Sequence, residues 1–172
     1  MPGLEPKRRG AHPKGMKPNI DISEPARASV VDMLNRLLSD EYVLLTKTRN
    51  YHWNVTGPQF NDLHKFFEAQ YDELNEIVDE VAERARQLDG RAFGTLAEFV
   101  KTSRLTEQPG TAPAATDMIR ALLSDHEAIV RSARADIGPV AEKFQDIGTS
   151  DYLTGLLEKH EKMAWMLRAS LR

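Results

Sequence analysis

Five side chains between residues 52 and 83 belong to types that coordinate metal ions. Two are imidazoles and three are carboxylates: His52, His64, Glu68, Asp79 and Glu83. In a helix, side chains four residues apart project from one face. His64 and Glu68 therefore form one pair, and Asp79 and Glu83 form another. Each pair could supply two ligands, and we predict that the five residues bind metal.

The two pairs cannot reach one metal from a single helix. Fifteen residues separate His64 from Asp79, which corresponds to about 22 Å along a helix axis and about 60° around it. A two-fold axis crossing the helix near Glu73 and Leu74 would set the first pair of one chain opposite the second pair of its partner, twice over. His52, just before a Thr-Gly-Pro turn, can fold back to the His64 end. The spacing therefore predicts a site shared by two subunits.

The ligand types favour iron. The chain has no cysteine, which excludes disulfides, thiolate zinc sites and thiol nucleophiles. Two imidazoles and three carboxylates suit iron better than calcium, which prefers oxygen ligands, or structural zinc, which closes as a tetrahedron richer in His or Cys. Carboxylates that bridge or bind weakly leave positions for an oxidant, so we predict redox chemistry on Fe(II). The Glu-x-x-His pairs of di-iron bundles do not occur in the needed places, so the site is not expected inside one bundle.

A structural interpretation competes with the metal site. Because 28% of the residues are charged, either pair taken alone is ordinarily solvated surface. His126 and His160 lie on apolar stripes, and we predict that both are hydrogen-bonded core residues. Trp53 and Trp165 are predicted to serve packing rather than to contact a cofactor.

Four long amphipathic helices should position these residues. Apolar side chains recur near a 3.6-residue period over 24–54, 59–89, 116–145 and 150–172. Ser23 is the expected N-cap of the first helix and Gly90 the expected C-cap of the second. Thr95 and Glu98 form a capping box for a short helix over 96–101, within a long connection. With no convincing strand and one long crossover, the pattern predicts an all-α, ferritin-like four-helix bundle.

The chain divides into a short arm and one domain. Residues 1–22 hold four of the nine prolines and few large apolar side chains, so we predict a disordered arm, followed by a bundle domain over 23–172. Residues 1–20 carry a charge of about +4 and the remainder of the chain about −7, a distribution that suits an arm contacting polyanions. No apolar run approaches the roughly 20 residues that cross a bilayer, and no signal peptide is visible, so we expect a cytoplasmic protein without a membrane partner.

Three stretches resemble a known family. HWNVTGPQF, LHKFFEAQYDELNEIVDEVAERARQLDG and GTLAEFVKTSRL are similar to segments of the Dps family, the DNA-binding proteins from starved cells, and the likeness extends over about residues 24–172. The resemblance implies a hollow homo-dodecamer built from two-fold dimers. It further implies a ferroxidase that oxidises Fe(II), preferably with hydrogen peroxide rather than dioxygen, and stores the product as a ferric mineral.

The resemblance also implies roles for particular residues. It divides the iron ligands between two subunits: His52, His64 and Glu68 of one, and Asp79 and Glu83 of its two-fold mate. Trp53 occupies the position of the family's tryptophan. Many members carry Asp where this chain has Glu68, so the longer arm could shift the second iron position, and Asp72 is a weaker candidate beside it. Iron would enter through negative pores near the junction of the last two helices, where the chain has Glu142, Asp146 and Asp151.

The arm is a candidate DNA-binding element. Some family members bind DNA through mobile basic N-terminal arms, and the basic residues here are Lys7, Arg8, Arg9, Lys14 and Lys17. Display on a dodecamer would make weak phosphate contacts collectively strong and steeply salt-dependent, so we expect nonspecific DNA binding and association with the nucleoid. The alternative for the arm is that its cations only keep it soluble. The alternative for the whole protein is a DNA-compacting structural protein whose metal site is degenerate or occupied by zinc.

Overall fold

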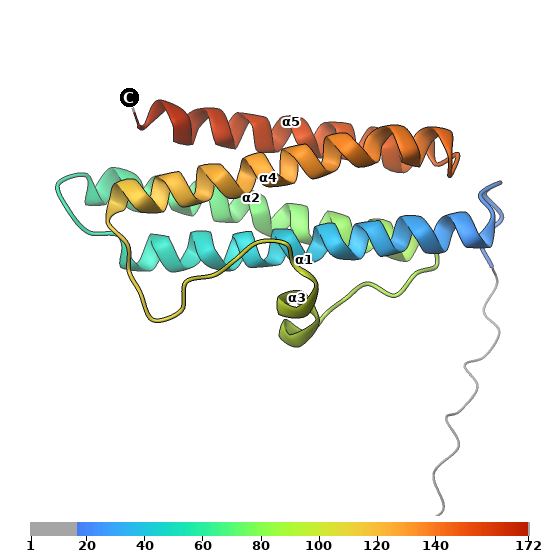
Figure 1. Ribbon diagram of the computed structural model, residues 1–172, viewed down its shortest axis with the longest axis horizontal. Coiled ribbons are helices and arrows are strands. Elements are labelled where there is room, and N and C mark those ends of the chain that lie inside the picture. Colours follow the sequence, from blue (N-terminus) through green and yellow to red (C-terminus); the bar gives the residue numbers. More distant parts are fainter. Residues whose placement is uncertain (1–16, 172) are drawn as a thin grey trace, which may run out of the picture.

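The computed structural model describes residues 17–171, and within them every regular element is a helix. Four long helices lie side by side, and a short one lies outside them against the first of the four (Figure 1). Their bounds are α1 Glu24–Asn54, α2 Phe60–Gln87, α3 Leu96–Thr102, α4 Ala115–Glu142 and α5 Ile147–Ala169. The predicted four-helix bundle with one long crossover is therefore confirmed. No helix within residues 17–171 combines the length and the apolar character that crossing a membrane requires.

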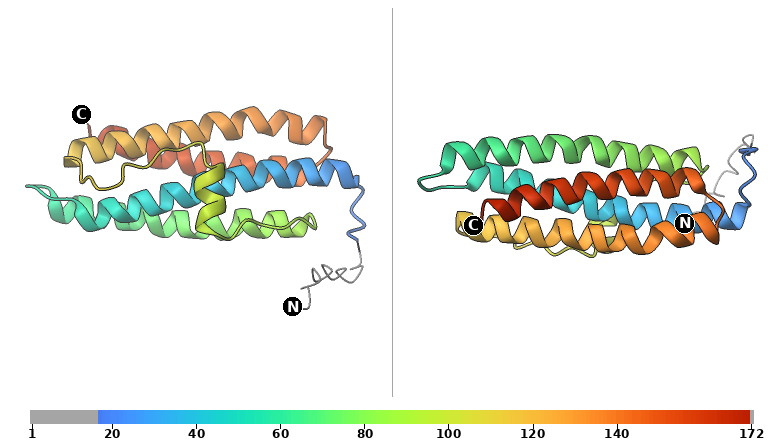
Figure 2. Two further views of the ribbon diagram at one scale, coloured as in Figure 1. Left: turned by 60° about the horizontal axis from the view of Figure 1, so that its bottom comes forward. Right: turned by 90° about the horizontal axis from the view of Figure 1, so that it is seen from above.

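The bundle is built from two helical hairpins. α1 packs along α2, and α4 packs along α5 (Figure 2). Each long helix turns one apolar stripe to the common core, where Leu34, Leu44, Phe67, Leu122 and Leu167 are almost completely buried. Burying a side chain of this size stabilises the fold by about 1.5–3 kcal/mol, so the stripes hold the four helices together.

Local signals in the sequence set several helix ends. The Ser23 side chain accepts a hydrogen bond from the Ala26 backbone N–H at the start of α1. Thr95 and Glu98 form the predicted capping box at the start of α3, each side chain binding the backbone N–H of the other. These contacts satisfy N–H groups that have no partner inside the helix.

The end of α2 differs from the prediction. Its C-cap is Leu88, and Asp89 takes the left-handed conformation with φ 66°. The expectation that Gly90 is the C-cap is wrong. A Cβ at Gly90 would lie 2.4 Å from both γ-methyl groups of Val31, so the glycine lets the chain pass close to α1.

The structure of the junction between α4 and α5 shows that one predicted pore residue, Asp146, is wrong. α4 continues through Pro139 to Glu142, and α5 begins at Ile147, three residues earlier than predicted. Asp146 is the N-cap of α5, and its carboxylate accepts hydrogen bonds from Thr149 N–H at 2.9 Å and from Arg84 Nη2 at 2.9 Å. Because it is 1% exposed, it cannot present a free carboxylate to a pore. Glu142 and Asp151 are exposed.

A buried carboxylate fastens the crossover to the bundle. Asp40 on α1 accepts hydrogen bonds from the backbone N–H and the Nε of Arg104, at 2.6 and 2.7 Å, and from the Ser103 hydroxyl at 3.0 Å. These bonds hold the segment after α3 against the outside of α1, so the long connection stays ordered.

Candidate metal centre

Two predicted ligands, His52 and His64, form a closely packed pair. Their rings stack with centroids 3.7 Å apart and planes 21° from parallel. His52 Nδ1 lies 2.8 Å from the backbone carbonyl of His64, and His64 Nδ1 lies 2.9 Å from the carbonyl of His52. A carbonyl oxygen only accepts, so both Nδ1 atoms carry the proton and donate. In the neutral imidazole each Nε2 then keeps its lone pair, which is the form that binds a metal.

The turn between the two helices brings the pair together. His52 lies in the last turn of α1, where backbone carbonyls have no partner within the helix, and the His64 ring supplies one. Gly57, with φ 118°, lets the chain reverse so that α2 starts beside the end of α1. The pairing satisfies backbone groups and fixes both tautomers at once.

Glu68 lies one helical turn beyond His64 and is exposed. We call His52, His64 and Glu68 the first half-site. Tyr71 flanks it, with its ring 5.2 Å from the His52 ring at an interplanar angle of 80°. Asp72, the weaker candidate, is also exposed.

Asp79 and Glu83 lie farther along α2, and both are exposed. We call these two residues the second half-site. Asp79 borders a groove between α2 and the α3 region, lined by Tyr42 and Phe99 among others. Among the ion pairs of residues 17–171, none involves Glu68, Asp79 or Glu83. Within the described chain, these carboxylates are thus free of ion-pair partners.

The two half-sites remain apart. α2 is one continuous helix, so the 15 residues between His64 and Asp79 place them about 22 Å apart along its axis. Within the described part of one chain, no three His, Asp or Glu side chains come together in a way that could hold a metal ion. A complete site on these ligands requires a second chain.

Exposed aromatic side chains flank the first half-site. Trp53 is 68% exposed beside His52, and Phe60, whose ring lies 5.2 Å from that of His64, is also exposed. Trp165 on α5 is 62% exposed. Neither tryptophan packs in the core of the chain, so the prediction that they serve packing is wrong for the single subunit.

His126 and His160 lie in the bundle core, as predicted. Their Nδ1 atoms are 2.9 Å apart, and His160 Nε2 lies 3.0 Å from Glu41 Oε1. All three side chains are fully buried. Burial, followed by the neighbouring His160, holds the pKa of His126 well below its ordinary value. One nitrogen of His160 faces His126 and the other faces Glu41. The three side chains therefore do not direct their possible metal-binding atoms at one point.

Sequence reasoning did not identify Glu41 as a core residue. The signal was available, because Glu41 occupies a position on the apolar stripe of α1, three residues before Leu44 and four after Leu37. A lone acidic residue on such a stripe indicates a buried polar contact.

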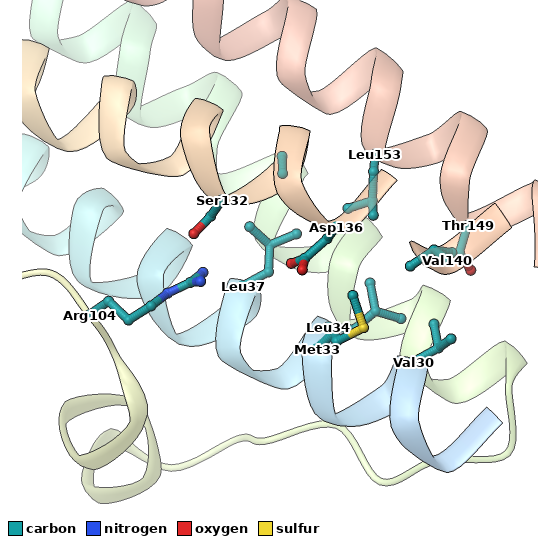
Figure 3. Close-up of a pocket in the computed structure, with 11 residues that line it drawn as sticks. Val30, Met33, Leu34, Leu37, Arg104, Ser132, Asp136, Val140, Thr149 and Leu153 are labelled. Carbon is teal, nitrogen blue, oxygen red and sulfur yellow. The ribbon is translucent and has the colours of Figure 1, made fainter. Parts of the chain in front are cut away.

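A narrow pocket elsewhere in the bundle has a different character. Leu34, Leu37 and Leu153 line it between α1, α4 and α5, with Asp136 and Arg104 as polar neighbours (Figure 3). Leu37 is 15 residues from His52, about 22 Å along α1. The pocket is therefore separate from the candidate metal centre.

The predicted DNA-binding residues fall almost entirely outside the described part of the chain. Lys7, Arg8, Arg9 and Lys14 lie outside it. Lys17 lies within it, and its Nζ pairs with the Glu24 carboxylate at 2.6 Å on the surface.

Comparisons with known proteins agree with the fold. Residues 31–172 match the model of the ferritin-like domain. An uncharacterised low temperature-induced protein of Nostoc sp. (strain PCC 7120) is 44% identical over 151 residues, which cover 88% of this chain and 84% of that protein. DNA protection during starvation protein 2 of Bacillus anthracis is 37% identical over 142 residues, covering 83% and 96% respectively.

A solved structure gives the same result in three dimensions. The Dps protein of Vibrio cholerae O1, described as a member of a broad superfamily of ferritin-like diiron-carboxylate proteins, superposes with a TM-score of 0.85 at 27% identity. The match covers 93% of this chain and 100% of that one. Together with the family model and the named relatives, it shows that the chain belongs to the Dps family of ferritin-like proteins.

Proposed function

We propose that the protein is a ferroxidase and iron-storage protein that assembles as a cytoplasmic homo-dodecamer. The observation that carries the proposal is the His52–His64 pair, in which both Nδ1 atoms donate to backbone carbonyls and both Nε2 atoms remain available. The arrangement satisfies backbone carbonyls, and it also gives a metal ligand a fixed tautomer and a fixed ring orientation.

The proposed site forms across a two-fold axis between subunits. The second half-site of one chain faces the first half-site of the other, giving each dimer two equivalent sites with two imidazoles and three carboxylates each. The uncommitted state of Glu68, Asp79 and Glu83 and the exposed Trp53 beside His52 support this arrangement. Contact with a second chain would cover that aromatic surface.

Iron is the substrate of the proposed reaction. Two Fe(II) ions each give one electron to hydrogen peroxide, whose O–O bond breaks, and the resulting Fe(III) hydrolyses to ferric oxyhydroxide with release of protons. The carboxylates favour the higher charge of Fe(III), and the imidazoles hold the Fe(II) that enters. Consuming Fe(II) and peroxide together prevents hydroxyl-radical damage to DNA, which suits relatives named for DNA protection during starvation.

Peroxide-driven iron oxidation tests the ferroxidase. The variant His52→Ala with Asp79→Ala removes one ligand from each half-site and should lose most of the rate. Glu158→Ala, an exposed carboxylate on α5 outside both half-sites, serves as the control and should keep the parental rate. If the double variant oxidises Fe(II) as fast as the parent, the ligand assignment is wrong.

DNA binding by the arm is a second proposed activity. Its support is the charge of about +4 on residues 1–20, which favours salt-dependent contact with phosphates. A gel shift at low salt should show strong retardation by the full chain and weak retardation by a chain that starts at Ser23. Equal retardation would remove the arm from the mechanism. DNA binding by a variant that lacks ferroxidase activity would not show whether the arm makes the contact. If the parent binds DNA fully but never oxidises Fe(II), the alternative of a DNA-compacting protein is favoured.

A further inference from the structure

One carboxylate in the bundle core has no hydrogen bond. Glu41 on α1 is fully buried, and within the described chain neither of its carboxylate oxygens has a hydrogen-bond partner. His160 on α5 lies beside it, with Nε2 at an ion-pair distance of 3.0 Å from Oε1 of Glu41. A buried carboxylate that is ionised and alone is strongly unfavourable, so such a group is either paired with a positive charge or neutralised by a proton.

No arginine or lysine is available to pair with Glu41. In the described part of the chain, the buried side chains of these types are Arg27 and Lys47. Arg27 donates to a backbone carbonyl near the start of α1, and Lys47 pairs with Asp125 at 2.6 Å. The buried residues of α2 include no titratable side chain. The charge of an ionised Glu41 is therefore left to His160 or to a proton.

The neighbouring titratable groups on α4 and α5 supply no positive charge. His126 Nδ1 lies 2.9 Å from His160 Nδ1, so one of these nitrogens carries a proton and the other accepts the hydrogen bond. Burial, followed by His160, holds the pKa of His126 well below its ordinary value, so His126 stays neutral. Burial, followed by the charges of Glu41 and Glu80, raises the pKa of Tyr152. The phenol of Tyr152 is therefore also uncharged.

We propose that Glu41 and His160 form a proton-binding site in the bundle core and hold one proton between them at neutral and mildly alkaline pH. The proton makes the pair electrically neutral, whether it resides on the imidazole or on the carboxylate. In water, glutamate and histidine side chains have both lost their protons at pH 8, so the site takes up one proton when the chain folds. Glu41 belongs to the α1–α2 hairpin and His160 to the α4–α5 hairpin, so the proton links the two hairpins inside the core.

Solid-state NMR of the assembled full chain at pH 8 tests the proposal directly. The ¹⁵N shifts of histidine distinguish a protonated ring nitrogen from one with a free lone pair, and the ¹³C shift of a glutamate carboxyl distinguishes the acid from the carboxylate. We expect either two protonated nitrogens on His160 or the acid form of Glu41. The double variant Glu41→Gln with His160→Gln assigns both signals by their loss. An ionised Glu41 beside a His160 with one bare nitrogen would refute the proton-binding site.

Urea unfolding at pH 8 separates the charge of Glu41 from its packing. His160→Gln leaves Glu41 without its partner and should lower the folding equilibrium constant about a thousandfold. Adding Glu41→Gln should recover most of this loss, because two amides need no proton. The matched control is Glu158→Gln, an exposed glutamate on α5, which should recover nothing when it is added to His160→Gln.

The outcome of this cycle bears on the core pair alone. If His160→Gln does not fold but the double variant does, that counts as the same recovery. If Glu41→Gln improves His160→Gln no more than Glu158→Gln does, Glu41 carries no charge that needs neutralising and the inference is refuted. The proposed ferroxidase would stand in that case, because Glu41 precedes His52 by 11 residues, about 16 Å along α1.

Discussion

The buried histidine pair makes the stability of the subunit depend on pH. Burial and the neighbouring His160 lower the pKa of His126 in the folded state, whereas in the unfolded chain it returns to its ordinary value of 6.5. As pH falls through 6.5, the unfolded state therefore binds a proton before the folded state does. The stabilisation is complete above pH 6.5 and is lost as pH falls below it.

The size of the effect follows from the linkage relation. While His126 stays neutral in the fold, lowering the pH from 7.5 to 5.5 should reduce the free energy of unfolding by about 1.4 kcal/mol. For a chain of this size, that corresponds to a fall of about 3–6 °C in Tm. Thermal unfolding of the parent and of His126→Asn, at one protein concentration, measures it. Asn keeps a hydrogen-bonding amide near the place of Nδ1 but does not titrate.

The difference between the two proteins isolates the contribution of His126. Other groups titrate in both proteins alike, so subtracting the two pH profiles should leave the predicted loss only in the parent. A constant offset reflects the cavity and the altered contact to His160. If the two Tm profiles run parallel from pH 7.5 to 5.5, the reasoning about the buried imidazole is wrong.

Three further predictions follow from particular contacts. Gly90→Ala should lower the free energy of unfolding by about 1–3 kcal/mol, because the new methyl group overlaps Val31; urea unfolding measures this, and adding Val31→Ala should recover part of it. Lys47→Met should destabilise the fold by about 1–3 kcal/mol, because it leaves Asp125, its partner at 2.6 Å, partly buried and unpaired. If adding Asp125→Leu recovers nothing in the same assay, the pair is not the cause. NMR titration should place the pKa of Glu98 at about 2, because an arginine and backbone amides bind its carboxylate; a value near 4.5 would mean that the capping box does not form.

The fold was largely predictable because its signals are local. The apolar period of the long helices and the capping box of α3 depend only on neighbours in the sequence. The helix ends were less predictable where tertiary contacts decide them. The sequence around Gly90 predicts a helix cap, but the glycine is required by Val31, which comes from another helix. The position of Asp146 in the sequence suggests a pore residue, but Arg84, which is distant in the sequence, and the start of α5 bind its carboxylate.

The candidate site, like the fold, could be predicted from the sequence only in part. The spacing of His64, Asp79 and Glu83 along one helix is visible in the sequence, and so is the need for a second chain. The exchange of hydrogen bonds between His52 and the backbone of His64 is not, because it depends on how the turn closes. The place of Tyr71 depends likewise on the packing of α1 against α2.

The central claim is that each metal site is shared by two subunits, and mixed assemblies test it most directly. His64→Ala breaks the first half-site and Glu83→Ala the second, so a dimer of the two variants keeps one intact site. Random co-assembly of equal amounts should restore about a quarter of the parental rate of peroxide-driven Fe(II) oxidation, since half of the dimers are mixed and each has one intact site of two. Mixing His64→Ala with Glu68→Ala, which both break the first half-site, should restore nothing. No recovery in the first mixture, or equal recovery in both, would contradict the shared site.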